Sequence, residues 1–216
     1  QDVYQRNFED FVFKPEEIDF VLLTHAHMDH SGLLPKLVKH GFNGKIYLTP
    51  PTAQLSEILL LDAAKIQEIN FNRGDMGSSN SAPMDIIYTT FDSLNTIASF
   101  VSVNFDELTP LGEDLSVKFL KAGHILGAGS LLIETEGKRI MFSGDLGRKD
   151  EAIIEPFFSA EGNELDVDYI VMESLYGGVT HQRRDDASKE LISMVKNTIE
   201  TGGNVVIPSF AVHKTQ

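Results

Sequence analysis

One short segment of this sequence concentrates the residues with the clearest capacity for chemistry. Three histidines and an aspartate fall within six positions: His25, His27, Asp29 and His30. Imidazole and carboxylate groups are the ligands that Zn²⁺ takes where thiolates are absent, and the chain has no cysteine. The segment DFVLLT at residues 19–24, directly before them, is apolar over its four central residues and predicts a buried strand. A strand end followed by a turn would let His25 and His27 converge on one point, with Asp29 and His30 aimed at a second point nearby.

Two single residues further along the chain complete a set of six candidate metal ligands. His124 lies in the glycine-bounded segment GHILG, and Asp145 lies in the segment SGDLG. Each of them alone is more simply explained as a satisfied polar group or a turn, and the first cluster alone has the alternative of a solvated loop before a helix. Together they form an ordered series: two histidines, an aspartate–histidine pair, a distant histidine, and an aspartate able to bridge two metal ions.

One further carboxylate and three further histidines need an interpretation. Glu173 ends an apolar run just before a Tyr-Gly turn, and taken alone it is most simply a surface carboxylate at a strand end. His40 is expected at a helix end, where its charge suits the helix dipole. His181 and His213 lie in polar segments near strand ends, and we expect none of these three histidines to bind metal.

The predicted strands and helices alternate along the chain. Apolar β-branched runs alternate with helical patterns, which predicts an α/β or layered αββα protein. Residues 73–84 are rich in Gly, Ser and Asn and predict a flexible loop. Residues 136–138 predict a hairpin turn. Strands are expected at 19–24, 45–49, 100–104, 115–121, 130–135, 139–142, 169–172 (buried) and 204–207, and helices around 33–38, from Pro51 onward, near 90–100, and at 185–201 with Leu191, Ile192, Val195 and Ile199 facing inward.

Composition excludes several classes of protein. The 216 residues include 18 Lys and Arg, 32 Asp and Glu and no Cys, for a net charge of −14. Without cysteine there is no disulfide scaffold, thiolate zinc site or cysteine nucleophile. The chain has no run of about 18 apolar residues, which a membrane span would need. The first residues also lack the pattern of a secretory signal, so we expect a cytoplasmic protein with no membrane partner. The acidity argues against a free-standing nucleic-acid binder, although a basic surface in another part of the protein is compatible with it.

These motifs resemble those of the metallo-β-lactamase superfamily. The string HAHMDH at residues 25–30, His124 in AGHILGAGS, and Asp145 in FSGDLGR carry the resemblance. Further segments are similar to the β-CASP branch of that superfamily: PPTAQL at 50–55, VMESLYG at 171–177, and IPSFAV at 207–212 with Gln216. The resemblance extends over nearly the whole chain, and the motifs follow the order of the family.

The resemblance implies a partial αββα metallo-β-lactamase fold. Residues 1–216 would form one incomplete domain that ends at the entry to a β-CASP domain, truncated at both ends. The first strands, the β-CASP insertion and the C-terminal block would lie outside the chain. His213-Lys214 departs from the pattern, since a small residue and Arg are usual there. An incomplete fold would expose strand edges and apolar surface, which favour a homo-oligomer.

The resemblance also implies an activity and a role for each candidate. It implies a zinc-dependent phosphodiester hydrolase acting on RNA, in which a water activated by two Zn²⁺ ions attacks phosphorus. The second zinc site would be the weaker one, because the family's C-terminal region normally adds a further histidine ligand. The alternatives are a hydrolase of thioesters, lactones or lactams, and a non-catalytic metal-binding fragment. In this family pattern, His25, His27 and His124 would bind the first metal ion, Asp29 and His30 would bind the second, and Asp145 would bridge the two. Two residues would be catalytic. Asp29 would orient the water, and Glu173 would position an imidazole that protonates the leaving oxygen.

Overall fold

The computed structural model describes residues 3–73, 86–148, 153–158, 165–180 and 184–215. They belong to two compact units, residues 1–173 and 174–216, which we describe separately. The predicted loop at 73–84 lies, apart from Arg73, outside the described residues. None of the helices that the structure describes has the length and apolar character needed to cross a membrane.

The first unit begins with a small parallel sheet. Its strands are β1 (Phe20–Leu22), β2 (Lys45–Leu48) and β3 (Phe100–Ser102), in that order. Parallel neighbours need crossover connections, and helices provide them here. Two short 3-10 helices precede β1, at Val3–Phe8 and Pro15–Glu17. Between the strands lie α1 (Met28–Ser31), α2 (Leu34–Lys39), α3 (Pro50–Arg73) and α4 (Thr90–Ile97).

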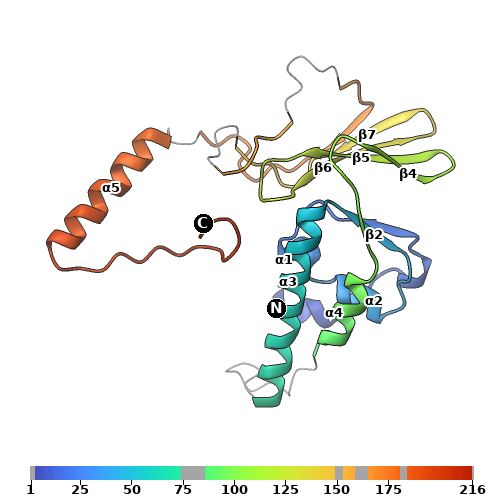
Figure 1. Cartoon of the computed structure of the whole chain (residues 1–216), viewed down its shortest axis with the longest axis horizontal. Helices are drawn as coiled ribbons and strands as arrows, with labels where there is room; N and C mark the ends of the chain where they lie inside the picture. Colours follow the sequence, from blue (N-terminus) through green and yellow to red (C-terminus); the bar gives the residue numbers. More distant parts are fainter. Residues whose placement is uncertain (1–2, 74–85, 149–152, 159–164, 181–183, 216) are drawn as a thin grey trace. The chain divides into compact units, whose positions relative to one another are not determined.

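The helices cover one face of this sheet, as Figure 1 shows. Along β2 the side chains alternate, so that Ile46 and Leu48 are fully buried and Tyr47 points to the opposite face. Ile46 and Leu48 join a core cluster with Leu34 and Leu37 of α2. The alternate apolar residues of β2 thus pack on the apolar face of α2, and this packing joins the helical layer to the parallel sheet.

The second sheet follows α4 and β3 in the chain. Its strands are β4 (Leu108–Gly112), β5 (Leu115–Lys121), β6 (Gly129–Thr135), β7 (Lys138–Phe142) and β8 (Tyr169–Val171), in sequence order. They pair antiparallel up to β7, and β8 is parallel to β7. We did not predict β4, in which Pro110 interrupts the strand pattern; an edge strand tolerates proline because it needs no full ladder of hydrogen bonds.

The two sheets pack face to face. Val117 and Phe119 of β5 are fully buried in a cluster with Leu131 of β6. Leu22 of β1 and Tyr47 of β2 pack against that cluster from the other sheet. The first unit is therefore a mixed α/β structure, in which helices pack on one face of the parallel sheet and the second sheet packs on its other face. This confirms the predicted fold class.

Three expectations about the last part of the chain are wrong. Strand β8 exists but is exposed rather than buried, because it is the last strand of its sheet and no described element of its unit covers it. Helix α5 (Arg184–Glu200) exists, but Leu191, Ile192 and Ile199 are exposed and Val195 is only half-buried, so this face is not turned inward within its unit. Residues 204–207 are not a strand, since no described strand of that unit offers them a partner.

Candidate metal centre

The first cluster of ligand candidates lies where β1 ends and α1 begins. The chain leaves β1 at Leu22 and continues to His27, which directly precedes α1. The buried Ser31 hydroxyl holds this stretch, because it lies 2.9 Å from the Ala26 carbonyl and 3.0 Å from the His27 carbonyl. The backbone between His25 and His27 is thereby fixed by the helix that follows it.

Two loops of the second sheet bring the distant candidates to the same place. His124 lies in the loop between β5 and β6, and Asp145 follows β7. The Gly147 N–H donates to the Ala122 carbonyl at 2.8 Å, which joins the loops directly. A Cβ atom on Gly147 would lie 1.5 Å from the Gly123 carbonyl oxygen, so only glycine allows this approach.

An apolar cluster beneath the candidate ligands draws on all three loops. It contains Ala26, between the first two histidines, and Ile125, next to His124. Leu146, which follows Asp145, packs against it, as do Leu55 and Leu59 of α3. Each loop therefore buries an apolar side chain on one side and presents a candidate ligand on the other. The remaining buried members of this cluster are Ala122 and Ala128.

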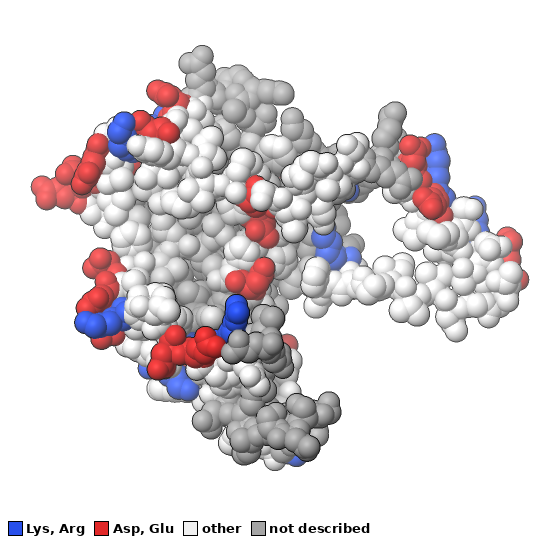
Figure 2. Space-filling model, turned by 180° about the vertical axis from the view of Figure 1, so that it is seen from behind, with Lys and Arg blue, Asp and Glu red and all other residues white. Residues whose placement is uncertain are grey.

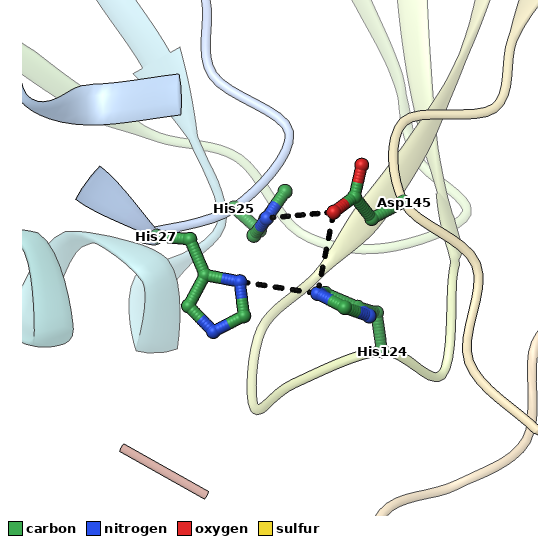
Figure 3. A group of neighbouring side chains, drawn as sticks. All are labelled: His25, His27, His124 and Asp145. Carbon is green, nitrogen blue, oxygen red and sulfur yellow. Dashed lines mark hydrogen bonds and ion pairs between the residues drawn. The ribbon is translucent and has the colours of Figure 1, made fainter. Parts of the chain in front are cut away.

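Four of the six candidates converge on one small space. Ligand atoms of His25, His27, His124 and Asp145 all lie within 4.8 Å of one another. His27 Nδ1 is 3.1 Å from His124 Nε2, and Asp145 Oδ2 is 3.5 Å from His124 Nε2 and 3.7 Å from His25 Nε2. Figure 3 shows the four side chains directed at a common centre.

The chemistry of this donor set fits a metal ion. His25 Nε2 is buried and has no hydrogen-bond partner among the described residues, while Nδ1 lies 3.1 Å from Thr24 Oγ1. Burial, and then repulsion from His30, His124 and His27, lowers the pKa of His25 to about 3, so its ring is neutral at pH 7 and keeps a lone pair. Two nitrogens on one tetrahedral zinc ion would lie about 3.3–3.4 Å apart, close to the separation of His27 Nδ1 and His124 Nε2.

The other two candidates lie beside this group. His30 Nε2 is 3.5 Å from Asp145 Oδ1 and 3.5 Å from Asp29 Oδ2. The Asp29 side chain is 78% exposed, so it is free to reach a ligand in solvent. A cavity of about 430 Å³ opens here, lined by His30 and Asp145 together with Glu173. Asp145 thus directs one oxygen toward the three-histidine side and the other toward His30.

Glu173 contacts the loop that carries Asp145. Its Oε1 accepts a hydrogen bond from the Leu146 N–H at 2.6 Å, and its own N–H donates to Ser143 Oγ at 3.0 Å. Together these bonds tie the end of β8 to both sides of Asp145. The carboxylate that we predicted to be catalytic therefore also holds a candidate metal ligand in place.

The histidines expected to bind no metal have different outcomes. His40 ends α2 and packs edge-on against the Phe11 ring, with 6.0 Å between ring centroids. His213 belongs to the second unit, in a turn with φ of 69°. His181 lies outside the described residues. Sequence reasoning missed Thr24, Ser31 and Ser143, although each stands within four residues of a candidate ligand.

Comparison with known proteins places the chain in a family. A model described as "Metallo-beta-lactamase superfamily" matches residues 4–209. The chain belongs to the metallo-β-lactamase superfamily. It is 33% identical over 212 residues to "Ribonuclease TTHA0252" of Thermus thermophilus, and 33% identical over 209 residues to "Transcription termination factor FttA" of Methanosarcina mazei. It is 30% identical over 208 residues to "Cleavage and polyadenylation specificity factor 73" of Drosophila melanogaster. These relatives confirm the resemblance of this metallo-β-lactamase chain to the β-CASP branch.

The matches cover most of this chain and a smaller share of each relative. They extend over 98% of the chain and 44% of the Thermus protein, 95% and 30% for the Methanosarcina protein, and 95% and 28% for the Drosophila protein. The metallo-β-lactamase chain therefore spans less than half the length of these curated relatives.

Proposed function

We propose that this chain carries the active site of a zinc-dependent phosphodiester hydrolase that acts on RNA. The observation that carries the proposal is the position of Asp145, whose Oδ2 lies 3.5 Å from His124 Nε2 and whose Oδ1 lies 3.5 Å from His30 Nε2. A carboxylate with its two oxygens facing separate groups of ligands suits a bridge between two ions. The names of the relatives, among them a ribonuclease, support RNA as the substrate.

The residues divide between two proposed ions. His25, His27 and His124 would hold the first zinc ion, Asp29 and His30 the second, and Asp145 would be shared. When bound, the ions would lower the pKa of a water molecule and offset the negative charge that develops on the phosphoryl oxygens. The second ion would be held more weakly, because one of its ligands, Asp29, has a side chain that is 78% exposed and must be ordered on binding.

Two carboxylates would act on protons and water. Asp29 Oδ2 lies 3.5 Å from Nε2 of His30, which lines the cavity, and from there Asp29 would orient the attacking water and accept its proton. Glu173 lines the same cavity. One of its oxygens is bound to the Leu146 N–H, and we propose that the other orients the group that protonates the leaving oxygen of the RNA.

An RNA cleavage assay tests the proposal. We expect a zinc-loaded protein that contains this chain to cleave an end-labelled RNA, and both a chelator and the His27→Ala substitution to stop cleavage. The His40→Ala protein, which loses a histidine outside the ligand group, should retain the activity. Cleavage that survives chelation, or hydrolysis of a thioester or lactam in place of RNA, would contradict the proposal.

Three expectations from the sequence stay predictions. They are a cytoplasmic location, self-association, and the assignment of residues 1–216 to one incomplete domain that leads into a β-CASP domain. Sedimentation measurements on the purified protein address the second of them.

A further inference from the structure

The loop that carries His124 is bound to the start of α3 by two threonines. Thr49 lies between β2 and α3, and Thr52 lies in the first turn of α3; both are fully buried. Thr49 Oγ1 lies 2.7 Å and Thr52 Oγ1 2.9 Å from the carbonyl oxygen of Gly127, three residues after His124. The two hydroxyl oxygens also lie 2.9 Å from each other. A carbonyl oxygen has two lone pairs, so the Gly127 carbonyl can accept both hydroxyl protons, and the shorter distance of Thr49 Oγ1 to the carbonyl favours that arrangement.

The contact is close on the side of the glycine as well. Gly127 has a φ of 82°, and a Cβ atom there would lie 2.5 Å from the Thr52 nitrogen. The turn is closed by the Ala128 N–H, which donates to the Ile125 carbonyl at 3.0 Å. The Ala122 N–H then donates to the Ala128 carbonyl at 3.0 Å. A fixed Gly127 carbonyl therefore fixes the short loop from which the His124 imidazole projects.

Capping of α3 does not account for these two hydroxyls. Thr49 Oγ1 lies 3.4 Å from the Thr52 nitrogen, a long distance for a capping hydrogen bond, and the Thr52 hydroxyl plays no part in it. Both bonds to the Gly127 carbonyl are shorter, and they join segments 78 and 75 residues apart in sequence. A carbonyl left buried without these donors would carry the cost of an unmade hydrogen bond.

We infer that Thr49 and Thr52 are positioning residues for His124, and that their buried hydroxyls hold the Gly127 carbonyl and with it the proposed metal ligand. The inference rests on the proposed zinc site for its effect on metal binding. Its effect on the loop itself is independent of any metal. Groups that orient metal ligands typically contribute about 10–100-fold to metal affinity.

The test replaces both threonines with valine, which has nearly the same shape but no hydroxyl. We expect the Thr49→Val/Thr52→Val protein to bind zinc at least about 10-fold more weakly than the parent. With a chelator present, its amides at 122–129 should exchange hydrogen faster. The Thr49→Ser/Thr52→Ser protein keeps both hydroxyls and should restore both properties. Thr96→Val is the matched control, because the Thr96 hydroxyl is equally buried but donates to the Asp92 carbonyl within α4.

The outcomes separate this inference from the proposed function. If the parent protein binds no zinc, the proposed function fails, and the exchange at 122–129 still decides the inference. Unchanged exchange and affinity in the double valine variant would overturn the inference, and so would an equal loss in Thr96→Val. Loss of the whole fold in the double variant and in Thr52→Val would also overturn it, because the hydroxyls would then serve the fold rather than the loop.

Discussion

At the scale of single residues, the site depends on a histidine that stays uncharged. His25 is buried, and three neighbouring histidines face it, so its pKa falls to about 3 from an ordinary value of 6.5. A protonated imidazole offers no lone pair to a metal ion, and a neutral one does. The burial that makes His25 costly to protonate thus keeps it available as a ligand.

This shift predicts how stability depends on pH in the metal-free protein. Between pH 6.5 and about 3 the unfolded chain binds a proton at His25 that the folded chain does not. The contribution of His25 to stability is therefore complete above pH 6.5 and is lost as the pH falls toward 3. Urea unfolding in chelator, at pH 5 and at pH 7.5, measures the change in the free energy of unfolding between these pH values. The His25→Gln side chain cannot titrate, so this variant should show a smaller change. An equal change would contradict the assignment of the pH dependence to His25.

Glu173 allows its two roles to be separated by two substitutions. Glu173→Gln keeps an oxygen for the Leu146 N–H, so zinc affinity should stay near that of the parent. In a protein that contains this chain, kcat on RNA should fall by about 10²–10⁴ with the loss of the ionisable carboxylate. Glu173→Ala removes the oxygen and should weaken zinc binding as well. Calorimetry and steady-state kinetics measure both effects.

Glu134→Gln provides the control for this pair, because Glu134 pairs with Arg139 on the second sheet. Glu134→Gln should change neither zinc affinity nor kcat on RNA. Unchanged turnover in Glu173→Gln would refute the role in proton transfer. Unchanged zinc affinity in Glu173→Ala would refute the role in holding the Asp145 loop.

At the scale of elements, the site is made where loops from both sheets meet. The segment after β1 and the loops after β5 and β7 each bring a candidate ligand, and the cluster around Ile125 packs beneath them. The closest approach is that of Gly147 to Gly123, where two backbones touch without a side chain between them.

This approach predicts the effect of one added methyl group. A Cβ atom at Gly147 would lie 1.5 Å from the Gly123 carbonyl oxygen, so Gly147→Ala must push the Asp145 loop away from the His124 loop. We expect a loss of stability above the about 1–3 kcal/mol typical of overpacking, together with weaker zinc binding. Gly112→Ala is the control, since its Cβ would meet only the Leu115 Cβ at 3.8 Å. Equal effects in both variants, by thermal unfolding and zinc titration, would contradict this.

The sequence predicts some of these elements and leaves others hidden for physical reasons. Ligand candidates such as His25 and His27 stand out because their types are uncommon and their spacing is short. Thr49 and Thr52 carry no such signal, since threonine is common and their partner is at least 75 residues away. Strand β4 was not predicted because Pro110 interrupts its strand pattern. The burial of β8 was predicted wrongly because burial depends on which elements pack against a strand, and the strand's own residues do not reveal this.

At the scale of the whole chain, the negative net charge disfavours binding of the proposed RNA substrate. The net charge is −14, and on the face shown in Figure 2 acidic side chains gather at several places, with basic ones beside some of them. RNA is a polyanion, and protein groups that bind its phosphates are normally Lys and Arg. Bound zinc ions would add positive charge at the proposed site, where a phosphate would bind.

We therefore expect RNA binding by this chain to require metal. Fluorescence anisotropy with a labelled RNA that resists cleavage should show binding with zinc and at least about a 10-fold weaker binding in chelator, with a shallow dependence on salt. Asp145→Asn, which alters the proposed bridge, should weaken the zinc-dependent part. Tight binding in chelator with a steep salt dependence would contradict the expectation, because it would reveal a basic RNA-binding surface.

We propose that His25, His27, His124 and Asp145 form one metal site and share Asp145 with a second site at Asp29 and His30. Calorimetric titration of the metal-free chain with zinc tests it most directly. We expect one tight site, abolished by His27→Ala, and one weaker site that Asp29→Ala removes while the tight site remains. Absence of zinc binding, or a tight site that persists in His27→Ala, would contradict it.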